Sequence, residues 1–61
     1  MLFRSDLKKE VIYELGNAYD KMGKAKEAVD EYKIIYMADS GYRDVSAKIN
    51  AFYELQKGAN A

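Results

Sequence analysis

The chain has 61 residues, with 10 basic and 10 acidic side chains, no His and no Cys, so its formal net charge is zero. That length allows one small domain at most, which buries only about 60% of the surface that its unfolded chain exposes. The balanced charge, mixed in sign along the chain, argues against nucleic acid and anionic membranes as main partners. Without His or Cys the commonest general base, thiol nucleophile and zinc ligands are missing, so we expect no enzyme, no cofactor and no metal site.

The chain carries no signal for a membrane. No apolar run approaches the roughly 20 residues of a membrane-spanning helix, and residues 1–4 are too few for the apolar core of a signal peptide. We therefore expect no membrane insertion. The absence of Cys fits a reducing compartment, so the cytoplasm is the expected location.

Residues 5–22 show the 3.6-residue period of an amphipathic helix, and Gly23 suits the left-handed conformation that often ends one. One face of this helix is apolar, and we expect it to be buried. Its residues are Leu7, Val11, Leu15, Ala18, Tyr19 and Met22. The opposite face is expected to be exposed, with Glu10, Tyr13, Asn17 and Asp20.

Two more helices follow. Residues 24–38 place Ala25, Ala28, Val29, Tyr32, Ile35 and Tyr36 on one apolar stripe. Ile34 and Met37 lie off this stripe, either as ordinary exposed apolar residues or as part of a second contact surface. After a turn signal at residues 39–41, residues 44–57 form a third stripe with Val45, Ile49, Phe52 and Tyr53. The sequence thus predicts one all-α segment over residues 1–61, with a hairpin at 5–38 and an additional helix at 44–57.

The first and third predicted helices match each other at an offset of 34 residues, where Val11 meets Val45, Leu15 meets Ile49 and Tyr19 meets Tyr53. A helix–turn–helix unit of that period is typical of tetratricopeptide repeats. The run LGNAYDKMGKAKEAVDEYKIIY resembles this family at Leu15, Gly16, Tyr19, Gly23, Ala28 and Tyr32. The resemblance implies a helix–turn–helix hairpin plus a third, capping helix, which is a fragment of an α-solenoid with about one and a half repeats.

The chain departs from the family pattern at four positions. Ile12 replaces the usual Trp, Ala25 an aromatic residue, Ile35 an Ala and Ser40 the terminal Pro. The ending IIYMADSGYRDVSAKI resembles the tails of bacterial tetratricopeptide proteins, which indicates a bacterial origin. Because Gly16 and Ala28 lack bulk, we expect the first two helices to approach most closely there.

The resemblance implies a protein-interaction module, because first-helix residues of this family line a groove that holds peptides. The corresponding residues are Glu10, Tyr13, Asn17, Asp20 and Lys21. Asn17 matches the Asn of the family's carboxylate-clamp members, but Tyr13 replaces the Lys of that clamp. Asn after this Gly is also common in the fold without any binding role. The expected partner is a protein or a peptide.

An alternative function follows from the small number of repeats. About three repeats are usually needed for stability, so with one and a half repeats either a longer parent protein has been cut or separate chains cover one another's apolar faces. The chain would then be a structural assembly or capping element that forms a homo-oligomer. The candidate residues for such self-association are Ile34, Ile35, Met37, Tyr42 and Phe52.

Overall fold

The computed structural model of the chain describes residues 5–59, which form three helices and no strand. Helix α1 spans Ser5–Lys21, α2 spans Ala25–Ala38 and α3 spans Val45–Ala59. The prediction of an all-α fold is confirmed, and the outer ends of the predicted segment 1–61 lie outside the described residues. Within the described range, no helix has the length and apolar character needed to cross a membrane.

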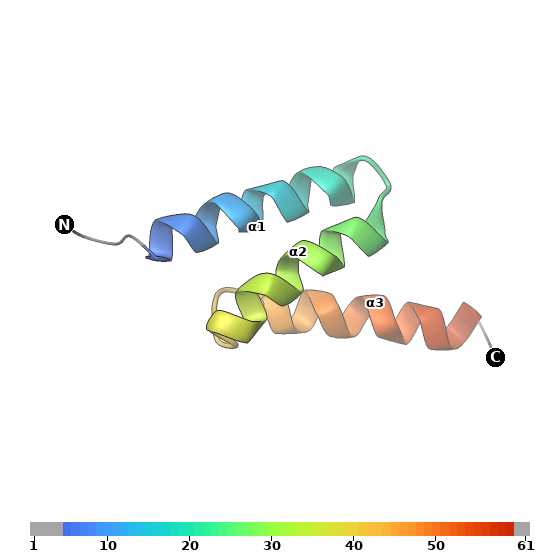
Figure 1. Cartoon of the computed structure of the whole chain (residues 1–61). Helices are drawn as coiled ribbons and strands as arrows, with labels where there is room; N and C mark the ends of the chain where they lie inside the picture. Colours follow the sequence, from blue (N-terminus) through green and yellow to red (C-terminus); the bar gives the residue numbers. More distant parts are fainter. Residues whose placement is uncertain (1–4, 60–61) are drawn as a thin grey trace.

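The helices follow one another in a zigzag, with α2 between α1 and α3 (Figure 1). Helix α2 packs against both neighbours, whereas α1 and α3 make no helix–helix contact in the described part of the chain. For this reason α2 supplies most of the buried side chains. The core consists of Ala28, Val29, Tyr32 and Ile35 from α2, with Tyr13 from α1 and Val45 from α3.

The turn between α1 and α2 is closed by Gly23, as predicted. Gly23 has a φ of 79°, which is the left-handed conformation that glycine adopts without steric cost. Its N–H donates to the carbonyl of Asp20 at 3.0 Å, and the N–H of Lys24 donates to the carbonyl of Tyr19 at 2.9 Å. This pair of bonds is a Schellman motif, which satisfies carbonyls that the end of a helix leaves free.

Helix α1 turns a different face to α2 than the sequence predicts. Most of the side chains expected inside lie on the surface, at 58% exposure for Leu7, 61% for Val11, 43% for Leu15 and 60% for Met22, whereas Tyr19 is half-buried and packs against the core as expected. Tyr13, expected on an exposed polar face, is only 8% exposed. The predicted burial of Leu7, Val11, Leu15 and Met22 and the predicted exposure of Tyr13 are therefore wrong, and α1 is rotated by roughly half a turn about its axis.

Gly16 supplies the physical reason for this rotation. It is buried on the inner face of α1, and a Cβ atom there would lie 2.6 Å from Cε1 of Tyr32. The ring of Tyr32 thus fills the space that a side chain would occupy, and its hydroxyl donates to Oδ1 of Asn17 at 2.7 Å. A close contact of α1 with α2 is present at Gly16, and the atoms nearest to it belong to the aromatic ring of Tyr32.

Candidate protein-binding surfaces

Three of the five predicted groove residues are bonded inside the molecule. The hydroxyl of Tyr13 donates to Oδ1 of Asp44 at 2.6 Å. Glu10 accepts a hydrogen bond from the hydroxyl of Tyr42 at 2.5 Å, and Asn17 accepts from Tyr32. These side chains hold the inner face of α1 against α2 and the loop that follows it.

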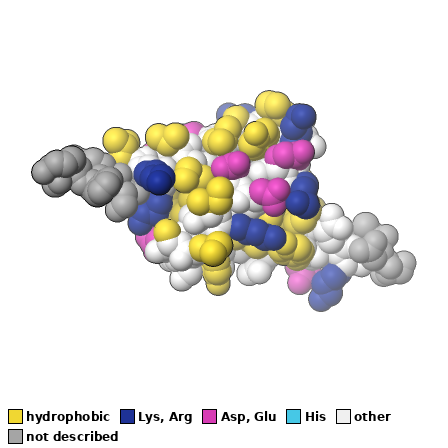
Figure 2. Space-filling view, viewed as in Figure 1, with side chains coloured by type: hydrophobic (Ala, Val, Ile, Leu, Met, Phe, Trp, Pro, Cys, Tyr) yellow, Lys and Arg dark blue, Asp and Glu magenta, His cyan; other side chains and the backbone are white. Residues whose placement is uncertain are grey.

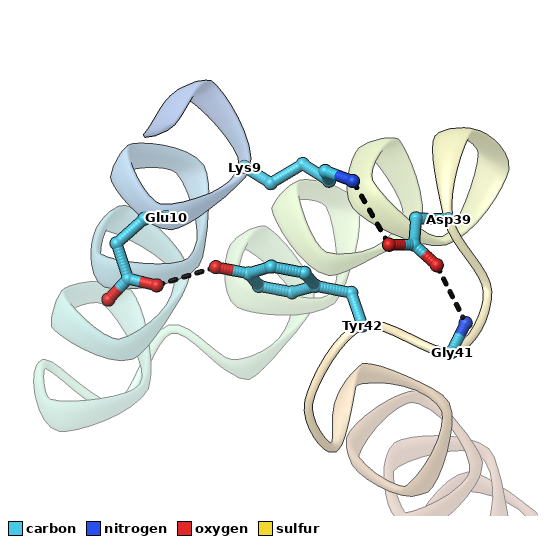
Figure 3. A network of polar contacts seen from close by, with 5 residues as sticks. All are labelled: Lys9, Glu10, Asp39, Gly41 and Tyr42. Carbon is cyan, nitrogen blue, oxygen red and sulfur yellow. Dashed lines mark hydrogen bonds and ion pairs between the residues drawn. The ribbon is translucent and has the colours of Figure 1, made fainter. Parts of the chain in front are cut away.

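That loop, residues 39–44, is tied to α1 by a set of polar contacts that we call the loop clasp. Besides the Tyr13–Asp44 and Tyr42–Glu10 hydrogen bonds, Nζ of Lys9 lies 3.0 Å from Oδ2 of Asp39. Arg43 pairs with Glu10 at 2.9 Å between Nη2 and Oε1. Figure 3 shows Tyr42 reaching from the loop to Glu10 while Lys9 reaches across to Asp39. The clasp therefore fixes the start of α3 relative to α1.

The loop itself is shaped by its own residues. Oδ1 of Asp39 accepts the N–H of Gly41 at 3.2 Å, which is an Asx-turn. Arg43 has a φ of 44°, a left-handed conformation that is uncommon for residues other than glycine. In this conformation its guanidinium carbon lies 5.0 Å from the ring centroid of Tyr13 and 5.8 Å from that of Tyr42. These cation–π contacts help to hold a backbone conformation that is otherwise disfavoured.

The clasp shifts the ionisation of its members. Hydrogen bonds from Tyr42 and Tyr13 lower the pKa of the Glu10 and Asp44 carboxyls, and the Lys9 ammonium lowers the pKa of Asp39. The bond to Asp44 raises the pKa of the Tyr13 hydroxyl to about 12. Each shift favours the protonation state that makes the contact, so the clasp is formed by ionised carboxylates and neutral tyrosines.

The two remaining predicted groove residues, Asp20 and Lys21, are exposed. Asp20 lies at the rim of a groove of about 210 Å³ that crosses α2 between α1 and α3. Lys48 stands among the residues lining the groove and places its ammonium 5.7 Å from the ring centroid of Tyr32. The rest of the lining is apolar: Ala25, Ala28, Val29, Tyr32, Ala51, Phe52 and Leu55.

The residues suggested for self-association are found in four different environments. Ile35 is fully buried in the core, and Tyr42 belongs to the loop clasp. Phe52 is half-buried, with its ring edge-on to Tyr53 at 5.3 Å between centroids. Ile34 and Met37 are open to solvent at 52% and 87% exposure. The structure thus does not bring these five residues together on one surface.

The outward side of α1 carries a row of exposed apolar side chains. We call it the outer stripe and define it as Leu7, Val11, Leu15, Ala18 and Met22, all of which are exposed. Figure 2 shows hydrophobic side chains gathered along the α1 edge of the molecule. A row of this kind, rather than single exposed residues, is typical of a contact surface.

Sequence reasoning missed the loop clasp and the outward position of the stripe. The run DSGYRD signalled the turn, with Tyr, Arg and Asp following the Asx-turn in succession, but not the contacts that these side chains make with α1. No group of three His, Cys, Asp or Glu residues within residues 5–59 could hold a metal ion. Comparison with protein-family models, with curated proteins and with solved structures finds no match to this chain.

Proposed function

We propose that this chain is a protein-interaction module of the helical-repeat type, related to tetratricopeptide units, and that it binds another protein through the outer stripe of α1. One observation carries the proposal. The inner face of α1 is already saturated by Tyr32 and the loop clasp, yet its outer face still presents a row of large apolar side chains to solvent. Exposed apolar rows on a surface rimmed by charge are typical of protein contacts.

The internal repeat supports this choice of face. Val45 and Ile49, which correspond to Val11 and Leu15 at the 34-residue offset, pack against the core at the α2–α3 contact. Val45 is fully buried there. Since the first and third helices have matching residues at these positions, Val11 and Leu15 are of the type that packs on a neighbouring helix. The expected partner is therefore a protein that offers a helical surface.

We therefore place the contact on the outer stripe of α1 and not on the groove residues proposed from the sequence alone. Glu10, Tyr13 and Asn17 are replaced as contact residues because breaking their internal bonds would leave polar atoms without partners inside the fold. Asp20 and Lys21 remain available at the end of α1, next to Met22.

A second candidate function is assembly through α2, and the exposure of Ile34 and Met37 favours it. These two side chains lie on a different part of the surface from the outer stripe. Ile34 lines a groove with Lys8, Lys9, Ile12, Ile35 and Ala38, whereas Met37 lines another with Lys33, Tyr36, Ser46, Ile49, Asn50 and Tyr53. The two candidates therefore make separate predictions for the same experiment.

Site-specific photocrosslinking in cells tests both. A photoreactive residue is placed at Val11, at Ile34, or at the exposed Glu27 of α2 as the matched control. Protein adducts at Val11 above the Glu27 background are the expected result. Adducts at Ile34 alone would favour assembly through α2, and no adducts above background at either position would contradict both functions.

A further inference from the structure

The outer stripe has the spacing of a helix that packs along one other helix. Val11, Leu15, Ala18 and Met22 follow one another at intervals of four, three and four residues, which is the a/d spacing of a two-helix seam. Met22 follows the last residue of α1 but keeps helical bonding, because its N–H donates to the carbonyl of Ala18 at 3.1 Å. The seam therefore extends over about three turns of regular helix.

We propose that the occupant of this seam is α1 of a second copy of the chain, running in the antiparallel direction. This inference rests on the proposed function, since it names the partner of the same surface. With this spacing, Leu15 and Met22 occupy a positions, and Val11 and Ala18 occupy d positions. In an antiparallel pair, the a positions of one helix meet the d positions of the other. Leu15 therefore packs over Ala18 of the second copy, and Met22 packs over Val11. Two-fold symmetry repeats both contacts, so Leu15 and Met22 each meet a smaller side chain.

The charges beside the seam select the antiparallel direction. Glu14 and Lys21 lie on the same flank of the stripe, two helical turns apart. Both are exposed, and neither forms an ion pair with a described residue. A two-fold axis that reverses the helix direction maps each flank onto itself. Glu14 of each copy therefore faces Lys21 of the other, and the pairing creates two equivalent ion pairs between opposite charges.

The other flank is also self-complementary in this register. Ile12 and Tyr19 are half-buried against the core of their own copy, and part of each side chain remains open beside the stripe. The antiparallel pairing places Tyr19 of one copy next to Ile12 of the other. The chain has no net charge, so no long-range repulsion opposes the approach of two copies.

Charge reversal tests the pairing and its direction by sedimentation equilibrium. Glu14→Lys puts Lys against Lys at both flank contacts, and Lys21→Glu puts Glu against Glu. Each single variant should dissociate about tenfold more readily than the parent chain, given the size of such surface pairs. An equimolar mixture of the two variants restores two attractive pairs, so it should form a heterodimer as tight as the parent dimer. The double variant Glu14→Lys/Lys21→Glu should behave likewise.

Both residues are exposed, so all variants should keep the helicity of the parent in circular dichroism. A parent chain that stays monomeric up to about 1 mM, the concentration scale of a very weak complex, would overturn the proposal. The proposal would also be overturned if the charge reversals left the dissociation constant of the dimer unchanged. The same holds if the equimolar mixture of the two variants bound no more tightly than either variant alone. The crosslinking experiment separates this failure from that of the proposed function: adducts at Val11 with a different protein would leave the function standing and refute self-pairing.

Discussion

Gly16 lies in the middle of α1, where glycine normally weakens a helix by roughly 0.5–1 kcal/mol relative to Ala. At Gly16 an added side chain has no room, because the Tyr32 ring occupies the space that it would need. That ring is buried, and its hydroxyl is bonded to Asn17, so it has little freedom to move aside. The close packing at Gly16 should therefore outweigh helix propensity.

We expect Gly16→Ala to lower the free energy of unfolding by about 1–3 kcal/mol, because the added Cβ forces the Tyr32 ring to shift. Urea unfolding followed by circular dichroism measures the change. Gly58→Ala is the matched control, since a Cβ at this position in α3 meets nothing within 4 Å. The control should be as stable as the parent or slightly more so. Equal effects of the two substitutions would contradict the packing described at Gly16.

Among the elements, the loop between α2 and α3 depends most on pH. Its clasp uses the carboxylates of Glu10, Asp39 and Asp44, each with a pKa below its ordinary value of 4.5, 3.8 and 3.8. A carboxyl whose pKa is lower in the folded than in the unfolded chain stabilises the fold above the unfolded pKa. This contribution is lost as the pH falls through the folded pKa. Acid should thus release the loop from α1.

We expect the melting temperature of the chain to fall as the pH drops below about 4.5, the highest of the three ordinary values. The double variant Tyr13→Phe/Tyr42→Phe keeps both rings but removes the hydroxyls that bond Asp44 and Glu10. Its melting temperature should be lower at neutral pH and should decline less steeply in acid. Parallel pH curves for the variant and the parent would show that the clasp is not the source of the acid sensitivity.

Among the three helices of residues 5–59, α2 is the only one in contact with both others. Helix α3 is held by the fully buried Val45 and by Lys33, whose Nζ lies 4.9 Å from the ring centroid of Tyr53. Because α3 does not pack on α1, loosening it should leave the α1–α2 hairpin in place. Stability should therefore be distributed unevenly along the chain.

Val45→Ala should accelerate amide hydrogen exchange in α3 more than in α1, at a cost of about 1–3 kcal/mol for the buried methyl groups. Exchange measured residue by residue by NMR under native conditions distinguishes the two helices. Leu55→Ala serves as the control, since Leu55 is 75% exposed and its loss should change little. A uniform increase across all three helices would mean that the chain unfolds as one unit.

The sequence was enough to predict the three helices, because each has a 3.6-residue apolar period and Gly23 marks a break between two of them. It was not enough to orient α1. Both of its faces carry large side chains, and treating Tyr13 as a polar surface residue hid its role in the core. The position of Gly16 on the Tyr13 side was the available signal, since a buried glycine indicates where another helix approaches.

The loop clasp could not be predicted for a different reason. Its contacts join residues 30 to 33 positions apart, and no local pattern specifies which Tyr meets which carboxylate over that distance. The run DSGYRD predicted a turn, and a turn is what the structure contains. The contacts that this turn makes with α1 can be identified only in the folded structure.

A protein whose helices touch only their neighbours along the sequence can assemble in the order in which the ribosome makes it. The helix–helix contacts of α1 with α2 need nothing that is synthesised later, so this hairpin can begin to close before α3 has been made. Translation reaches the clasp next, and Asp44 immediately precedes α3. The later elements, first the loop clasp and then Val45 of α3, thus complete the core against helices that have already been made.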